Sequence, residues 1–220
     1  MTEHHLAVTR TARYYQLGEL SPATRRIWFV CHGYGQLAAY FSRHFAFLTE
    51  ADPHTVVIAP EGLSRFYLRG NGGRVGASWM TSDDRLHEIE DHIGFLNQLA
   101  AQVLATCPAG VHTTVLGFSQ GTATVGRWLT RAPFRPDRLV LWAGGFPEDM
   151  AAPDVTRLLR GLDLTLVLGS RDEYISTAKM TEQQALLQQL GATPRLLTFD
   201  GKHELNRAVL EKIVATPTNS

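Results

Sequence analysis

The sequence predicts a three-layer α/β domain in which helices cover both faces of a mostly parallel sheet. Short, continuously apolar runs such as IWFVC, TVVIA and LTLVLG are typical of strands that are buried on both faces of a parallel sheet. Segments with helical periodicity lie between these runs, so strands and helices alternate along the chain.

The expected elements follow one another in this alternating order. We expect strands at residues 6–15, 26–31, 55–59, 112–116, 138–142, 164–168 and 195–199. The first is longer and alternates in polarity (VTRTARYY), which indicates an antiparallel edge hairpin. We expect helices at residues 36–50, 84–104, 119–131, 177–190 and 204–214.

The clearest helical pattern covers residues 84–104. Thr81 and Asp84 resemble a capping box before this helix. Apolar residues then recur every three or four positions, as expected for one buried helical face: Leu86, Ile89, Ile93, Leu96, Leu99 and Val103.

Composition limits the classes of function. The chain has 220 residues with 21 basic and 21 acidic side chains, a balance that argues against a nucleic-acid partner. We expect no signal peptide and no stable membrane insertion, and we expect Cys31 and Cys107 to be free thiols in the cytoplasm. We expect one domain over residues 1–214, as a monomer or homodimer, and a disordered tail at 215–220.

Four short motifs follow strands. They are CHGYG at 31–35, GFSQG at 117–121, GSRD at 169–172 and DGKH at 200–203. In an open α/β sheet, functional groups gather beyond the carboxyl ends of the strands. The four motifs are therefore expected at one edge of the sheet.

The GFSQG motif identifies a candidate nucleophile. A G-x-S-x-G sequence between a strand and a helix is typical of a sharp turn that exposes the serine hydroxyl above the sheet. Ser119 occupies that position. The backbone N–H of Gln120 and that of Tyr34, in the loop after an early strand, are the expected oxyanion-hole donors. We expect His32 to anchor this loop.

The partners of Ser119 are expected further along the chain, in the order acid and then histidine. Among nine histidines, His203 alone lies after Ser119. Asp172 follows a strand and is the preferred acid, with Glu173 and Asp200 as competitors. These residues predict a Ser–His–Asp triad.

We expect neither a cofactor nor a metal ion, because the Ser–His–Asp triad requires none. His87 and His92 superficially resemble a zinc-binding helix. Their spacing of five residues places them about 140° apart around a helix, whereas a spacing of four keeps both ligands on one face. We therefore expect a solvated helix face there.

These motifs resemble the phospholipase/carboxylesterase group of α/β hydrolases, and the resemblance covers nearly the whole chain. GFSQG matches the group's serine turn, and Ser78-Trp79-Met80 resembles its Ser-Trp-Phe stretch. The resemblance implies an α/β-hydrolase fold without a large cap domain. It also implies a triad of Ser119, Asp172 and His203, with oxyanion donors from Tyr34 and Gln120.

The sequence departs from the group's pattern at three places. Met80 replaces the usual phenylalanine, Tyr34 stands in the oxyanion loop, and segment 61–76 is individual to this chain. Residues 61–78 are rich in glycine, which suits either a mobile lid or a plain surface loop. The candidate substrate-binding residues are Tyr34, Phe66, Tyr67, Trp79, Trp142, Phe146 and Tyr174.

The expected function is a serine carboxylic-ester hydrolase that acts on small or linear acyl esters through an acyl-enzyme. An acyl thioesterase or lysophospholipase would use the same triad. A non-catalytic, ligand-binding relative is the alternative of another class, but such proteins usually lose a triad residue.

Overall fold

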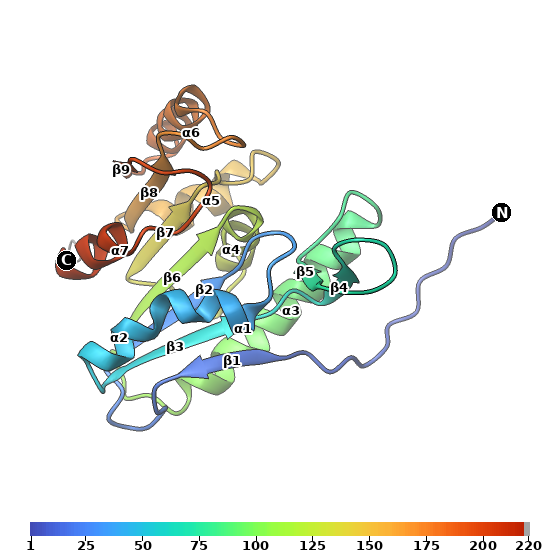
Figure 1. Cartoon of the computed structure of the whole chain (residues 1–220), viewed down its shortest axis with the longest axis horizontal. Coiled ribbons are helices and arrows are strands. Elements are labelled where there is room, and N and C mark those ends of the chain that lie inside the picture. The colour runs from blue at the N-terminus through green and yellow to red at the C-terminus, as the bar shows by residue number, and fades with distance from the viewer. Residues whose placement is uncertain (218–220) are drawn as a thin grey trace.

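A seven-stranded sheet with the order β1-β3-β2-β6-β7-β8-β9 forms the centre of the protein (Figure 1). The computed structural model describes residues 1–217. Only β1 runs antiparallel, against β3, and the other neighbours are parallel. The strands of this sheet are β1 (Tyr14–Leu17), β2 (Arg26–Cys31), β3 (Thr55–Pro60), β6 (His112–Phe118), β7 (Arg138–Trp142), β8 (Asp163–Gly169) and β9 (Arg195–Phe199).

Helices cover both faces of the sheet. One apolar cluster contains side chains of α3, α4, α5 and α6, and the other contains side chains of α1, α2 and α7. The helices are α1 (Ala38–Phe41), α2 (Ala46–Ala51), α3 (Arg85–Leu104), α4 (Gln120–Leu129), α5 (Ala152–Leu159), α6 (Thr177–Gln189) and α7 (Arg207–Ala215). This arrangement confirms the predicted fold class.

The sheet separates the two clusters because side chains alternate along each strand. In β2, Ile27, Phe29 and Cys31 enter the cluster under α3 to α6, whereas Trp28 and Val30 enter the other. A strand buried on both faces therefore needs a continuous apolar run, which is the pattern that predicted these strands.

The edge strand is shorter than predicted. β1 begins at Tyr14, not at residue 6. Tyr14 pairs with Pro60, the last residue of β3, so the preceding residues lie beyond the end of the neighbouring strand. The alternating pattern of VTRTARYY therefore belongs largely to an exposed segment that has no strand partner in the described chain.

Several local predictions also differ from the structure. Leu86 is 69% exposed, because the buried face of α3 begins at Ile89. Thr81 forms no capping box: its backbone N–H donates to Glu88, and its hydroxyl donates to the carbonyl oxygen of Asp83.

The expected helix 36–50 is divided into α1, a 3₁₀ helix (Ser42–Phe45) and α2. The sequence patterns missed α5 and a hairpin of β4 (Ser64–Tyr67) and β5 (Val75–Ser78).

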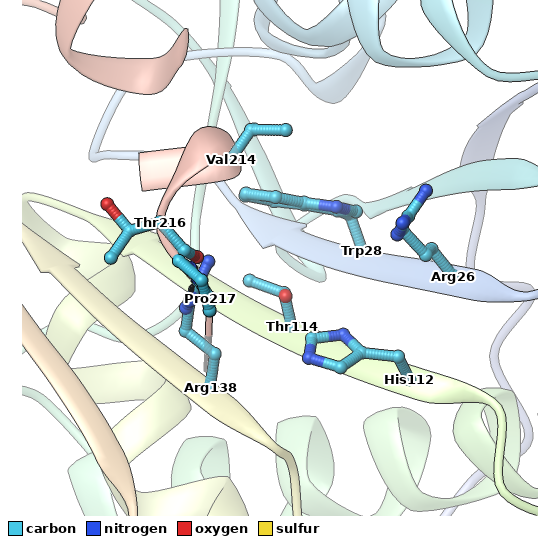
Figure 2. A pocket seen from close by; sticks show the side chains of 8 residues that line it. All are labelled: Arg26, Trp28, His112, Thr114, Arg138, Val214, Thr216 and Pro217. Carbon is cyan, nitrogen blue, oxygen red and sulfur yellow. Dashed lines mark hydrogen bonds between the residues drawn. The ribbon is translucent and has the colours of Figure 1, made fainter. Parts of the chain in front are cut away.

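A buried guanidinium joins the sheet to the last helix. Arg138, at the start of β7, donates from Nε to Asp163 Oδ2 at 2.7 Å and from its other nitrogens to the carbonyl oxygens of Ile213 and Thr216. Figure 2 shows Arg138 beside a small cavity of about 180 Å³ at the amino ends of β2 and β6. The expected disordered tail does not begin at residue 215, because Ala215 belongs to α7; residues 218–220 lie outside the described part of the chain.

Arg138→Ala is expected to reduce the free energy of unfolding by about 3–5 kcal/mol, because it leaves Asp163 buried without its close partner. Arg157→Ala is the control: it removes an exposed pair with Asp154, and a change below about 0.5 kcal/mol is expected. Urea unfolding of both variants checks this, and equal losses would contradict the structural role of Arg138.

Candidate active site

A strained turn presents Ser119 between β6 and α4. Its backbone has φ 54° and ψ −117°, a conformation that non-glycine residues rarely adopt. Gly121 allows the turn to pack closely: a Cβ there would lie 2.3 Å from the carbonyl oxygen of Cys31. The backbone N–H of Ser119 donates to Trp142 in the neighbouring strand at 2.8 Å.

Asp172 and His203 meet at the same edge of the sheet. His203 Nδ1 lies 2.8 Å from Asp172 Oδ2. The other carboxylate oxygen accepts the backbone N–H groups of Tyr174 and Ile175 at 2.8 and 3.0 Å, and the Asp172 side chain is fully buried. These bonds fix the carboxylate, and the carboxylate in turn orients the imidazole so that Nε2 is its remaining nitrogen.

The two competing acids point elsewhere. Glu173 is exposed and pairs with Lys202, and Asp200 is 83% exposed and pairs with Arg171. Both therefore lie outside the contact with the imidazole.

The loop that carries His203 is tied to its neighbours. A Cβ on Gly169 would lie 2.3 Å from the carbonyl oxygen of Lys202, so the glycine at the end of β8 lets this loop approach. The indole N–H of Trp142 donates to the carbonyl oxygen of Glu204 at 2.9 Å. The ring of His203 packs against Phe118, the residue before Ser119, with centroids 5.0 Å apart.

Two backbone N–H groups remain available beside the serine turn. Gly33 donates to the side chain of Gln36, and Gly35 donates to the carbonyl oxygen of Ala77. Within residues 1–217, the N–H groups of Tyr34 and Gln120 donate to no protein acceptor. A Cβ on Gly33 would lie 3.1 Å from the Cβ of Ser119, so the two turns are in contact.

A brace formed by Trp79, Met80 and the side chain of Gln120 holds these two turns together. The Gln120 carboxamide accepts the backbone N–H of Trp79 at 3.1 Å and donates to the carbonyl oxygen of Met80 at 2.8 Å. The indole N–H of Trp79 donates to the carbonyl oxygen of His32 at 2.9 Å. The glutamine of GFSQG and the tryptophan of SWM therefore belong to one network.

His32 anchors the loop after β2 through both of its ring nitrogens. Its Nε2 accepts the N–H of Gly62 at 3.0 Å, so Nδ1 carries the proton and donates to the carbonyl oxygen of Gly33 at 2.7 Å. That carbonyl belongs to the same peptide group as the N–H of Tyr34. Burial lowers the pKa of His32, which favours this neutral form.

His92 does not lie on a solvated face, contrary to the sequence prediction. It is 1% exposed and packs edge-on against Trp79, whereas His87 is exposed. The spacing of five residues places His87 on the outer face of α3 and turns His92 toward the core. Burial lowers the pKa of His92 to about 4.

The candidate pocket residues fall into separate groups. The rings of Tyr34 and Phe66 are in tilted contact with centroids 5.1 Å apart, and Tyr67 and Tyr174 are exposed. Trp79 and Trp142 are buried and hold loops in place, so the structure does not place them as lining residues. Phe146 lines a cavity of about 400 Å³ beside α4. The apolar wall of this cavity also contains Met80, Ala123, Pro147, Ile175 and Met180.

Sequence reasoning missed two residues that hold the loop after β2 in place. Gln36 accepts the N–H of Gly33, and the buried carboxylate of Glu61 accepts the N–H of Ala38 while it pairs with Arg13. No motif marks either residue: the contact of Gln36 depends on the local turn at 33–36, and the partners of Glu61 are distant in the sequence. Met80, which the sequence motif does contain, contributes through its backbone: its carbonyl oxygen accepts a hydrogen bond from the Gln120 carboxamide.

Comparison with models of protein families gives a match over most of the chain. The model of the phospholipase/carboxylesterase family matches residues 20–216. Comparison with curated protein sequences gave no significant match. None of the helices within residues 1–217 is long and apolar enough to cross a membrane.

Several solved structures share the fold. Esterase PE8 is 22% identical, with a TM-score of 0.70 over 94% of this chain and 97% of that one. Acyl-protein thioesterase 2 of Zea mays is 19% identical, with a TM-score of 0.68 over 92% and 96%. A carboxylesterase of Mesorhizobium loti is 20% identical, with a TM-score of 0.67 over 94% and 95%. These matches confirm the α/β-hydrolase fold.

Acidification is expected to destabilise the fold through His92. Its pKa is about 4 in the folded chain and about 6.5 when unfolded, so the unfolded chain binds more protons as pH falls through this window. The contribution of His92 is complete above pH 6.5 and is lost by about pH 4, with a total of about 3 kcal/mol. Urea unfolding at several pH values should show a smaller pH dependence for His92→Gln than for the parent. Identical slopes would exclude this role.

Proposed function

The chain belongs to the phospholipase/carboxylesterase family of α/β hydrolases, and we propose that it is a serine hydrolase of small or linear acyl esters. The observation that carries this proposal is the 2.8 Å contact between His203 and a fully buried Asp172, at the sheet edge where Ser119 occupies a strained turn. A nucleophile, a base and an orienting acid are the groups that acyl transfer to serine requires.

The first step forms an acyl-enzyme. Nε2 of His203 takes the proton of the Ser119 hydroxyl as Oγ attacks the ester carbonyl carbon. Asp172 stays ionised, holds the imidazole in the required tautomer and stabilises the imidazolium. The C–O bond to the alcohol then breaks, and the alcohol leaves with the proton from His203.

The developing oxyanion is stabilised by the backbone N–H groups of Tyr34 and Gln120. Loss of one such donor in related chemistry costs about 10²–10³ in rate. The brace and His32 support this role because they fix both peptide groups before substrate binds, so little reorganisation is needed.

The second step restores the enzyme. His203 takes a proton from water, whose oxygen attacks the acyl carbon, and the tetrahedral intermediate collapses as the proton passes to Ser119 Oγ. The products are a carboxylic acid and the free serine. This scheme uses no metal or cofactor.

The cavity beside α4 has apolar side chains that can contact an acyl group, among them Met80, Phe146 and Ile175. Charged side chains also line it: Arg85, Arg127, Glu148, Asp149 and Lys179. An acyl thioester would react by the same steps, and the fold is shared with an acyl-protein thioesterase. Turnover of an ester and a thioester with the same acyl chain distinguishes the two substrate classes.

We further propose a cytoplasmic location, as expected for a chain with two free cysteines.

Ser119→Ala should reduce hydrolysis of p-nitrophenyl esters, from acetate to decanoate, by about 10⁴-fold or more, because the nucleophile is lost. Ser170→Ala is the matched control, since Ser170 is an exposed serine that directly follows another strand of the same sheet, β8, and it should keep parental activity. Comparable activity of Ser119→Ala and the parent would refute the nucleophile.

Asp172→Asn should lower kcat by about 10⁴-fold, because the amide no longer holds the imidazole in the required tautomer. Glu173→Gln and Asp200→Asn change the two competing acids and should stay within a few-fold of the parent. Steady-state kinetics of the three variants identifies the acid. A comparable loss of kcat in Asp200→Asn or Glu173→Gln would show that Asp172 is not the acid of the triad.

A further inference from the structure

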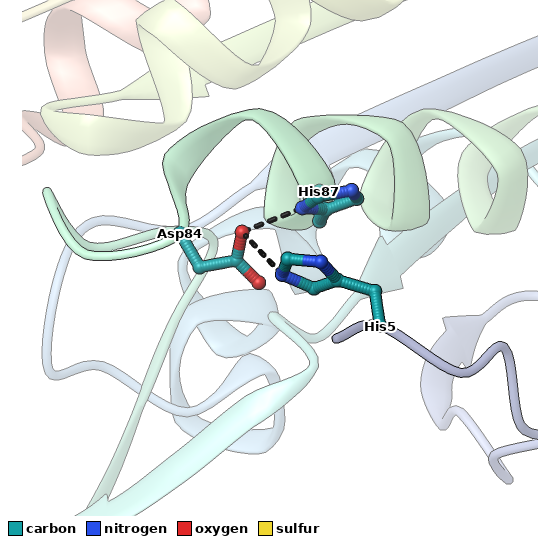
Figure 3. A group of neighbouring side chains, drawn as sticks. All are labelled: His5, Asp84 and His87. Carbon is teal, nitrogen blue, oxygen red and sulfur yellow. Dashed lines mark hydrogen bonds and ion pairs between the residues drawn. The ribbon is translucent and has the colours of Figure 1, made fainter. Parts of the chain in front are cut away.

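Three potential metal ligands meet at the start of α3. His5 comes from the exposed segment before β1, Asp84 is the residue before α3, and His87 lies in the first turn of that helix (Figure 3). One ligand atom from each side chain lies within 4.8 Å of the other two. Two segments that are far apart in the sequence therefore bring two imidazoles and a carboxylate together.

The distances suit a tetrahedral ion with a small adjustment. Asp84 Oδ1 lies 3.4 Å from His5 Nε2 and 2.5 Å from His87 Nδ1. Ligand bonds of about 2.0–2.1 Å in a tetrahedral site place ligand atoms about 3.3 Å apart. The contact between Asp84 and His5 already has this length, and rotation of the exposed Asp84 carboxylate can open the other.

The two imidazoles also lie face to face. The rings of His5 and His87 stack with centroids 4.0 Å apart. Glu3 adds a further carboxylate, with Oε1 3.2 Å from His5 Nε2. Carboxylates on both sides of the histidines favour a cation, and Glu3 or water can provide a fourth ligand.

The chemistry of these donors indicates the kind of ion. Imidazole nitrogens with a carboxylate oxygen suit Zn²⁺ and similar transition metals, whereas Mg²⁺ and Ca²⁺ prefer oxygen ligands alone. The side chains of His5, Asp84 and His87 are 44%, 41% and 55% exposed, so an ion can enter without a change in the core.

We propose that His5, Asp84 and His87 form a structural zinc site that fastens the segment before β1 to the start of α3. The site shares no residue with the ester-hydrolysis scheme and does not depend on it. Its consequence is mechanical: the helix turn that receives the segment also carries Glu88, which binds Ser64 and Thr81.

Zinc titration of the untagged protein tests the proposal. Competition with a chromogenic chelator measures the affinity, in a Cys107→Ser background that removes the partly buried thiol. His5→Ala and His87→Ala should each weaken zinc binding by about tenfold or more, since loss of an outer partner alone costs about 10–100-fold at metal sites. His4→Ala is the matched control and should bind as the parent does.

Proteolysis provides a second readout that does not depend on affinity. Zn²⁺ should slow tryptic cleavage after Arg10 in the parent, because the bound segment is held against α3, and should have no effect on His87→Ala. Equal zinc affinity in the parent, His5→Ala and His87→Ala would overturn the proposal, as would an equal loss in His4→Ala. Zinc binding without protection of Arg10 would overturn the fastening role.

Discussion

The close approach of Gly121 to the carbonyl groups of Cys31 and His32 is the constraint on which the rest of the site depends. A Cβ at this position would lie 2.3 Å from one carbonyl oxygen and 2.8 Å from the other. β2 and β6 are neighbours in the sheet, with Cys31 opposite Gly117, so the loops after them begin side by side. The glycine lets these loops touch. The turns that carry Tyr34 and Gln120 therefore lie in contact, and the hydrogen bonds of Trp79 to Gln120 and to His32 connect them.

The second half of the site depends on the other end of the strand order. β8 and β9 are parallel neighbours, and a glycine at the end of β8 again allows close packing, here against the loop of His203. Asp172 is then held by two backbone N–H groups and needs no movement to meet the imidazole. The ends of the parallel strands β6, β8 and β9 thus place the loops that carry Ser119, Asp172 and His203 at one edge of the sheet.

The sequence could predict the features that depend on local pattern. Strands buried on both faces need continuous apolar runs, and the serine turn needs glycines at fixed positions, so both leave a readable signal. Features that depend on distant partners gave none. β1 is short because β3 ends at Pro60, and Leu86 is exposed because the buried face of α3 begins only at Ile89. His92 was predicted to be exposed but is buried, because a change of one position around a helix is enough to turn a side chain from solvent to the core. The contact between Asp172 and His203 joins two loops that are 31 residues apart in the sequence.

The central claim is that Ser119 is an activated nucleophile. Incubation with an alkyl fluorophosphonate, followed by intact-mass measurement and peptide mapping, tests it most directly, because such reagents phosphonylate serines that a neighbouring base has activated. The account predicts one adduct per chain, located on the peptide that contains Ser119, together with loss of esterase activity. An adduct on another residue, or persistent activity without modification of Ser119, would contradict it.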